Sequence, residues 1–265
     1  MLKLGLISAT IKEALAEDTT GVLQHLYSLG LQGVEKPEDY PVGTKGIPER
    51  IAVPVSWDDI PGGYAHLKEN KPWSPDSLDT TIPQLVARAR EVSAPYAVQY
   101  WGPADDADQV MRQAAMLDTV GKRLAAEGIT FCYHNHDHEF KPLPGSDDGA
   151  RAIDLLLANS DPQHLGFEFD LGWVRVGGED PAQFLRQHPG RAPLVHVRDV
   201  EHLETRGAFT LPGLGILDIP EILSACKEVG TEWVILEPNK TELLTPMEFI
   251  TASILNMRMM GIGGN

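Results

Sequence analysis

The sequence has few cysteines and no apolar run of membrane-spanning length. Its 265 residues include two cysteines, Cys132 and Cys226, which lie far apart, so a disulfide-based scaffold is excluded. No apolar run approaches the ~20 residues of a membrane-spanning helix. The first residues, MLKLGLISAT, lack a basic region followed by a long apolar block, and they predict a strand rather than a signal peptide. We therefore expect a cytoplasmic protein that does not enter a membrane.

Basic residues are also scarce. The chain has 22 Lys and Arg against 38 Asp and Glu, which gives a formal net charge of -16. Such a charge repels nucleic acid and anionic membranes, so we expect neither as a partner. Hydrophobic residues make up 42% of the chain, which is enough for a full core and excludes general disorder. The length suits one large α/β barrel or two small domains.

Short apolar segments typical of buried strands alternate with segments at helical spacing. The expected strands are residues 3–8, 31–35, 50–55, 96–101, 128–133, 165–174, 192–197 and 231–237. The expected helices are residues 22–29, 80–93, 106–127, 149–160, 218–229 and 246–260, with another that begins at Asp180. About eight such repeats favour a closed (β/α)8 TIM barrel that forms one domain over residues 1–265. A doubly wound sheet is disfavoured because the segment after the first strand, SATIKEA, has no glycine.

The most unusual segment is residues 131–140, FCYHNHDHEF. A β-branched and aromatic run leads into it, which is typical of a buried strand. Alternate side chains of a strand share a face, so we expect His134 and His136 to point the same way. Two imidazoles at a strand end suit a divalent metal such as zinc, manganese or iron. A histidine-rich surface loop is the alternative for this segment taken alone.

Polar side chains also end the next three expected strands. Asp170, His196 and Glu237 each follow or close an apolar run, one repeat apart. Catalytic residues of TIM barrels lie at the C-terminal ends of strands, so these side chains and His134 should converge. Two imidazoles and two carboxylates can hold one divalent ion and leave positions open for substrate. Taken singly, Asp170 could be a turn residue, His196 a hydrogen-bonded core histidine and Glu237 an ion-pair partner.

Other candidates lie beside these four, and each has a structural alternative. Glu168 is expected to point into the barrel, so it is either a base or part of an ion pair. Glu139 either orients a ligand histidine or is an exposed loop acid. Trp101 and Trp173 end expected strands and either stack on a sugar or fill the core. Arg198 offers a cation to a substrate oxygen or phosphate.

Several motifs resemble the xylose-isomerase-like TIM-barrel superfamily, in its sugar phosphate isomerase/epimerase branch. The resemblance covers nearly the whole chain and lies in GLQGVE, YHNHDHEF, FEFDLGW, GGEDP, VHVRD, PGLGILDIPEIL and VILEPN. It implies one divalent ion (manganese, zinc, cobalt or magnesium) held by strands five to eight. Asp170, His196 and Glu237 match three of the usual ligands. Many relatives have Glu-Asn-His on strand five, where this chain has HNH, so His134 stands in place of a glutamate and the usual two-glutamate proton transfer is in doubt.

The resemblance implies a metal-dependent sugar or sugar-phosphate isomerase or epimerase. In that chemistry a carboxylate removes the proton next to a carbonyl and an enediolate stabilised by the metal forms. The same residues suit an inosose-dehydratase-like lyase. The substrate, its phosphorylation and the metal stay open. Glu237 is the leading acid/base, with Glu168 or Glu139 as the second carboxylate and His136, Trp101, Trp173 and Arg198 as substrate contacts.

Two other classes are less favoured. An abasic-site endonuclease shares this barrel but needs a basic DNA-binding face, which a net charge of -16 does not provide. A sugar-binding protein without activity would not need four intact candidate ligands. An irregular excursion at residues 57–75 could reach a neighbouring copy or cover the site, and we expect a homodimer.

Overall fold

The structure is a computed structural model that describes residues 1–35, 45–146, 149–239 and 243–262. The chain divides into two compact units, each of which is described by itself. The terminal unit comprises Met1–Ala52 and Asp170–Asn265, and the middle unit comprises Val53–Phe169. The expectation of one domain over the whole chain stays a prediction.

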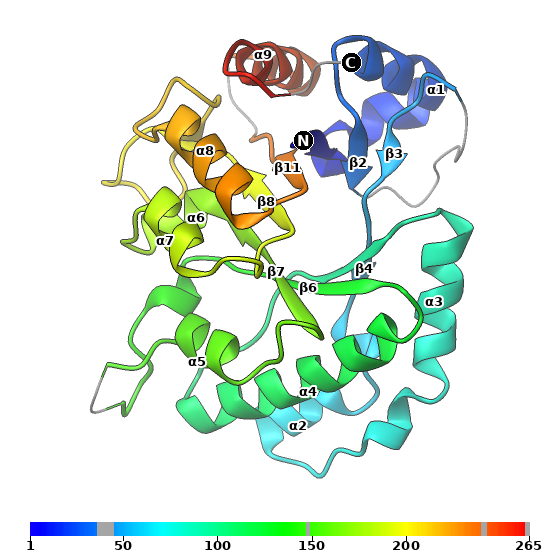
Figure 1. Cartoon of the computed structure of the whole chain (residues 1–265), viewed down its shortest axis with the longest axis vertical. Helices are drawn as coiled ribbons and strands as arrows, with labels where there is room; N and C mark the ends of the chain where they lie inside the picture. Colours follow the sequence, from blue (N-terminus) through cyan, green and yellow to red (C-terminus); the bar gives the residue numbers. More distant parts are fainter. Residues whose placement is uncertain (36–44, 147–148, 240–242, 263–265) are drawn as a thin grey trace. The chain divides into compact units, whose positions relative to one another are not determined.

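Parallel strands form the core of the terminal unit. Its strands pair in the order β3 (Glu49–Arg50), β2 (Gly33–Glu35), β1 (Lys3–Ile7), β11 (Trp233–Leu236) and β8 (Leu194–Val197). Nearly every residue of these strands is buried, as expected of parallel strands with both faces covered. A short antiparallel pair, β9 (Asp199–Val200) and β10 (Phe209–Thr210), follows β8. In Figure 1, the paired strands β11 and β8 lie side by side in this unit.

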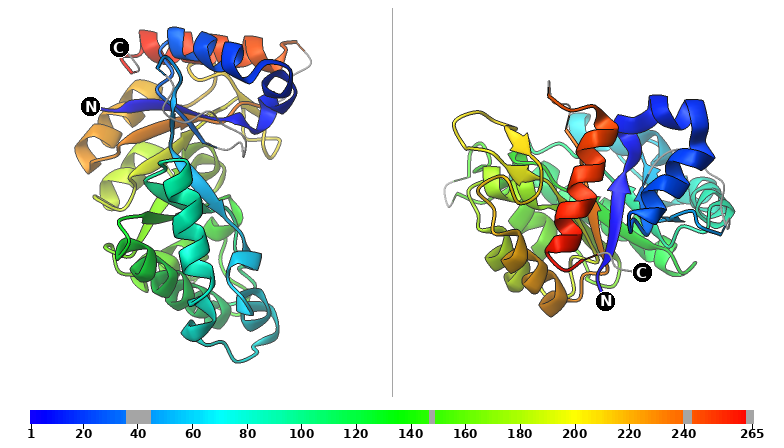
Figure 2. Two further views of the ribbon diagram at one scale, coloured as in Figure 1. Left: turned by 90° about the vertical axis from the view of Figure 1, so that its right-hand side faces the viewer. Right: turned by 90° about the horizontal axis from the view of Figure 1, so that it is seen from above.

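Two helices of the terminal unit, those after Asp180 and Asp218, begin where the sequence predicts their starts. The helices of this unit are α1 (Lys12–Ser28), α6 (Leu171–Val176), α7 (Pro181–Gln187), α8 (Ile219–Val229) and α9 (Pro246–Met259), with a 3-10 turn η1 (Ser8–Ile11) before α1. The Asp180 and Asp218 side chains accept N–H bonds at the starts of α7 and α8, each followed by an early proline. The helix expected over residues 22–29 begins earlier, at Lys12, and Asp18 lies at a kink inside it and accepts the Gly21 N–H. Helices α1 and α9 lie on the same side of β1 and β11 (Figure 2).

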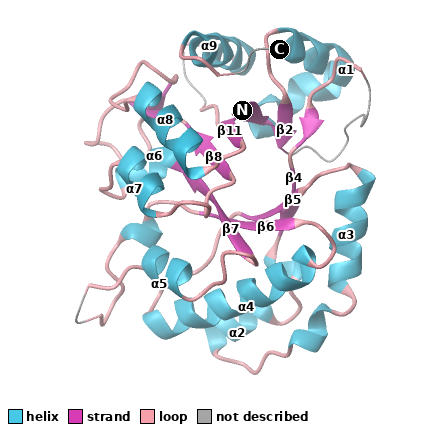
Figure 3. Cartoon of the chain, in the orientation of Figure 1, coloured by secondary structure: helices cyan, strands magenta, loops and turns pink. Residues whose placement is uncertain are grey.

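Strands and helices also alternate in the middle unit. Its strands β4 (Ala52–Val55), β5 (Tyr96–Gln99), β6 (Thr130–His134) and β7 (Leu165–Asp170) follow one another in the sheet. Its helices are α2 (Gly63–Glu69), α3 (Thr81–Glu91), α4 (Ala107–Ala125) and α5 (Ala152–Ala158), with 3-10 turns η2 (Trp57–Asp59), η3 (Pro75–Leu78) and η4 (His138–Phe140). Helix α4 packs along β6 and contacts α2, α3 and α5 (Figure 3). The expected excursion after β4 is confirmed and contains η2, α2 and η3.

Two expected strand ends are wrong, the strand expected to carry both His134 and His136 stops before His136, and each correction moves a candidate residue. Strand β7 ends at Asp170 rather than at residue 174, because the Asp170 carboxylate accepts the Trp173 N–H at 2.9 Å and begins α6. Trp173 is therefore helical. Strand β5 ends at Gln99, so Trp101 lies in the following loop, and β6 ends at His134, so His136 lies beyond the strand.

Among the residues that the structure describes, no helix has the length and apolar character required to cross a membrane. This agrees with the absence of long apolar runs in the sequence.

Candidate active site

A histidine and two glutamates meet in the terminal unit, and one of the glutamates is not among the predicted site residues. His196 lies in β8, Glu237 directly follows β11, and Glu35 ends β2. The His196 ring bridges the two glutamates: Nε2 is 2.8 Å from Glu35 Oε2, and Nδ1 is 2.8 Å from Glu237 Oε2. His196 and Glu35 are fully buried, whereas the Glu237 side chain is 25% exposed. The signal that could have found Glu35 was its place at a strand end, in GLQGVE.

The two contacts of His196 restrict its chemistry. A neutral imidazole has one N–H donor and one lone pair, whereas a carboxylate oxygen only accepts. With a carboxyl group at each ring nitrogen, one of the two contacts needs either a further proton, on the ring or on a carboxyl group, or a cation shared between nitrogen and oxygen. Metal-binding histidines commonly donate one N–H to a carboxylate and use the other nitrogen as ligand. Glu35, which is completely buried, is suited to accept the N–H of His196. The other ring nitrogen, which faces Glu237, is then the one available to bind a metal.

Arg198 joins this cluster through two acids. Its Nη2 is 2.7 Å from Asp170 Oδ2 and also contacts Glu237 Oε2. The guanidinium lies 4.5 Å from the ring centroid of Phe209 and 5.5 Å from that of Trp173. Burial works to lower the pKa of Arg198, but the charges of Asp170 and Glu237 and the hydrogen bonds to them raise it. Arg198 therefore stays charged and neutralises two of the predicted ligands.

The donor set of the terminal unit fits a divalent ion. One ligand atom from each of Asp170, His196 and Glu237 lies within 4.8 Å of the others. An imidazole and two carboxylates are ligands that zinc, manganese and related ions accept. His196 Nδ1 and Glu237 Oε2 are both acceptors unless a proton or a cation lies between them. A metal ion at this contact would bind both atoms. The residues therefore fit the metal that the sequence predicts.

The middle unit holds the other predicted ligand and its acid. His134 Nδ1 is 2.9 Å from Glu168 Oε2, and both side chains are buried. The Tyr100 ring packs 5.6 Å from the His134 ring, measured between centroids. Glu168 thus forms a hydrogen bond with the histidine on the neighbouring strand. Its roles as a base or as part of an ion pair stay predictions. The role of His134 as a metal ligand stays a prediction.

Glu139 is a buried acid that holds the loop after β6. Its Oε1 accepts the Tyr133 hydroxyl at 2.7 Å, and its Oε2 accepts the His136 backbone N–H at 2.9 Å. Burial raises the pKa of Glu139, and the His138 charge and these hydrogen bonds oppose that rise only in part. The alternative of an exposed loop acid is wrong, because the side chain is 1% exposed. Its contacts favour an orienting role over that of a second proton carrier.

The predicted substrate contacts differ in exposure. Trp101 is 41% exposed, so part of its side chain is accessible to a ligand, although its ring lies 6.5 Å from that of Tyr64 and 6.2 Å from that of His138 between centroids. Trp173 is 8% exposed and packs edge-on against Phe209, which favours the core-filling alternative. His136 is half-buried. Arg198 is 6% exposed, so only a small part of it is accessible to a substrate, next to Asp170 and Glu237.

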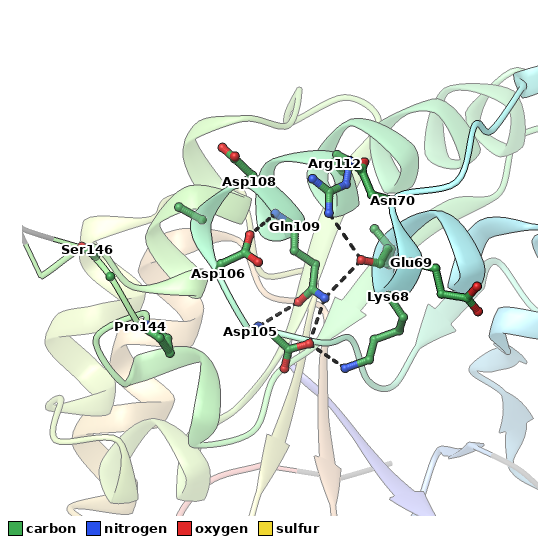
Figure 4. Close-up of a pocket in the computed structure, with 13 residues that line it drawn as sticks. Lys68, Glu69, Asn70, Asp105, Asp106, Asp108, Gln109, Arg112, Pro144 and Ser146 are labelled. Atoms are coloured by element: carbon green, nitrogen blue, oxygen red, sulfur yellow. Dashed lines mark hydrogen bonds and ion pairs between the residues drawn. The ribbon is translucent and has the colours of Figure 1, made fainter.

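A hollow of about 680 Å³ in the middle unit lies apart from these residues (Figure 4). The end of α2 and the start of α4 line it, with Lys68 2.6 Å from Asp105 and Gln109 2.9 Å from the same carboxylate. Within the described part of the chain, its lining includes none of the predicted site residues. These polar side chains bind one another, so we assign the hollow no part in the chemistry.

Known proteins similar to this chain include enzymes. The inosose dehydratase of Lacticaseibacillus casei is 29% identical over 146 residues, which are 49% of this chain and 47% of that protein. The chain thus matches about half the length of this curated relative. A sugar phosphate isomerase/epimerase from Parabacteroides distasonis has a similar structure, with a TM-score of 0.82, 20% identity, and coverage of 99% of this chain and 96% of that one.

A second solved structure, the IolI protein with a zinc atom, gives a TM-score of 0.67 at 14% identity, with 98% of each chain covered. The chain therefore shares the fold of these two structures. The model of one family, described as xylose isomerase-like TIM barrel, matches residues 77–255 and confirms the predicted TIM barrel fold. Because this match spans more than half of the sequence, the chain belongs to the xylose isomerase-like TIM barrel family.

Proposed function

We propose that the chain is a metal-dependent isomerase or epimerase of a sugar or sugar phosphate that removes a proton next to a carbonyl. The observation that carries the proposal is the cluster of Asp170, His196 and Glu237, which brings an imidazole and two carboxylates within ligand distance of one another. The substrate class is supported by the family and by two similar proteins, an inosose dehydratase and a sugar phosphate isomerase/epimerase, whose names refer to polyhydroxylated substrates.

Asp170, His196 and Glu237 would hold the ion, and His134 as a further ligand remains a prediction from the sequence. The ion would supply Lewis-acid polarisation of the substrate carbonyl. Zinc is the first ion to test, because the similar IolI structure contains it, with manganese, cobalt and magnesium as the others. Glu35 would hold the His196 ring in place by accepting its other N–H.

Glu237 is the residue that we assign to proton transfer. It is the most exposed carboxylate of the cluster, and its Oε2 already faces a ring nitrogen and a guanidinium. A general base must reach the proton of the substrate, which a fully buried acid such as Glu35 does not. The Arg198 guanidinium, beside Glu237, is placed to bind a substrate oxygen.

A dehydratase is the second candidate, and the inosose dehydratase relative favours it. Epimerisation with two bases needs a second available carboxylate on the opposite face of the substrate. Glu139 has both oxygens engaged, and Glu168 bonds to His134, so neither is an obvious second base. Isomerisation and dehydration, which one base can start, therefore fit this chain better than two-base epimerisation.

Removing a predicted ligand should remove the ion. We expect purified Asp170→Asn and His196→Ala to contain much less divalent metal than the wild type, because each loses a donor of the set. Inductively coupled plasma mass spectrometry measures the content. The matched controls are Asp58→Asn and His25→Ala, which replace exposed side chains. Equal metal content in all five proteins would rule the site out.

Glu35 should affect metal affinity without binding the ion. We expect Glu35→Gln to weaken zinc binding by about 10–100-fold, the usual effect of losing a carboxylate that orients a ligand histidine. Calorimetric titration of chelator-treated protein measures the affinity, with the exposed Glu17→Gln as control. An unchanged affinity together with unchanged folding would show that Glu35 does not orient His196.

A further inference from the structure

A second group of metal-binding side chains lies in the middle unit. Ligand atoms of His136, His138 and Glu139 all lie within 4.8 Å of one another. The residues lie close together in the loop and the turn η4 that follow β6, and none belongs to the set formed by Asp170, His196 and Glu237. Glu139 is buried, while the two histidines are half-buried, so the group can be reached from solvent.

The hydrogen bonds of His138 fix which nitrogen is available. Its Nε2 is 3.0 Å from the carbonyl oxygen of Gly102. A carbonyl oxygen only accepts, so Nε2 carries the hydrogen in that contact. In the neutral ring, Nδ1 then has a lone pair, and it lies 3.1 Å from Glu139 Oε2, which also only accepts. Either a proton, on His138 or on Glu139, or a cation must lie at this contact.

The surroundings of the Glu139 carboxylate favour the binding of a cation. Its described partners are the Tyr133 hydroxyl, the His136 N–H and the His138 ring, and among the residues that the structure describes no lysine or arginine contacts it. A carboxylate has about four acceptor positions, so its two hydrogen bonds leave room for a metal bond. Two imidazoles and a carboxylate form the donor set of several zinc sites that keep one position open.

We propose that His136, His138 and Glu139 bind a second divalent ion of the zinc type. With three protein ligands, the fourth position is left to water or to a hydroxyl oxygen of a bound compound. The site goes beyond the proposed function, because it shares no residue with the first ligand set and does not depend on catalysis.

The test is the number of zinc ions bound by the full chain after chelator treatment, from calorimetric titration and mass spectrometry. We expect two ions per wild-type chain, and one in His138→Ala and in Asp170→Asn. The control is His164→Ala, which removes another half-buried histidine whose Nδ1 is 3.1 Å from a carboxylate, that of Asp118, and should leave two ions. Circular dichroism checks folding, and Glu139→Gln serves as a second variant should His138→Ala unfold.

Cobalt provides an independent readout. The Trp101 ring lies 6.2 Å from the His138 ring between centroids, so Co2+ bound there should quench its fluorescence, and Trp101→Phe should remove that quenching. One ion in the wild type that persists in His138→Ala, without quenching at Trp101, would overturn the proposal and leave an ion pair between His138 and Glu139. One ion that is lost in His138→Ala but kept in Asp170→Asn would support this site and contradict the set in the terminal unit.

Discussion

Replacing Glu237 by Gln should lower turnover by about 10²–10⁴-fold, the usual worth of a general acid or base. Glutamine keeps the shape of the side chain but does not take up the proton that the carboxylate is assigned to remove. Incubation of candidate keto-sugars and inososes in deuterium oxide, followed by mass spectrometry, measures the reaction. The wild type should incorporate deuterium next to the carbonyl, and the variant should do so only at the reduced rate.

The same experiment separates the two candidate reactions. An isomerase or epimerase leaves the product mass unchanged apart from deuterium, whereas a dehydratase removes one water. The control Glu201→Gln, which replaces an exposed acid of the terminal unit, should retain full activity. Because Glu237 is also a proposed ligand, metal content is measured alongside, and the assay is run at saturating metal. Exchange in Glu237→Gln at a rate close to that of the wild type would assign the base elsewhere.

Replacing Arg198 by Met should destabilise the protein by about 3–5 kcal/mol when metal is removed by chelator, as for other buried pairs that lose one partner. The guanidinium binds both Asp170 and Glu237 and is almost completely buried. Methionine keeps most of the stem but leaves the two carboxylates without this charge. Urea unfolding followed by circular dichroism measures the free energy of unfolding.

Two conditions should reduce that loss. Zinc should restore part of the stability, because an ion bound only by the folded chain stabilises it by mass action. Acid should also reduce it, since protonation of the two carboxylates removes the unpaired negative charge. The control Arg123→Met breaks an exposed pair with Asp79 and should change stability little. Equal stability of Arg198→Met and wild type in chelator would contradict this account.

The sequence by itself determined the local features of the chain. Apolar strand segments, helix caps such as Asp180 and Asp218, and the polar residues at strand ends follow from neighbouring residues, so periodicity and capping rules find them. His196 and Glu237 were found in this way. The position of Trp173 was predicted wrongly, because the Asp170 carboxylate captures a backbone N–H and starts a helix where the apolar run predicts a continued strand.

The tertiary structure decided the pairings between distant residues. His196 binds Glu35, 161 positions away, and no local pattern signals that contact. Arg198 binds Asp170 and Glu237 in the same way, across separate strands. The tertiary structure also decides solvent exposure: Glu139 is buried with both oxygens hydrogen-bonded, whereas Glu237 is partly exposed. Charge neutralisation and solvent exposure depend on which strands become neighbours, and that is set by the packing of the whole sheet rather than by the residues alongside each side chain.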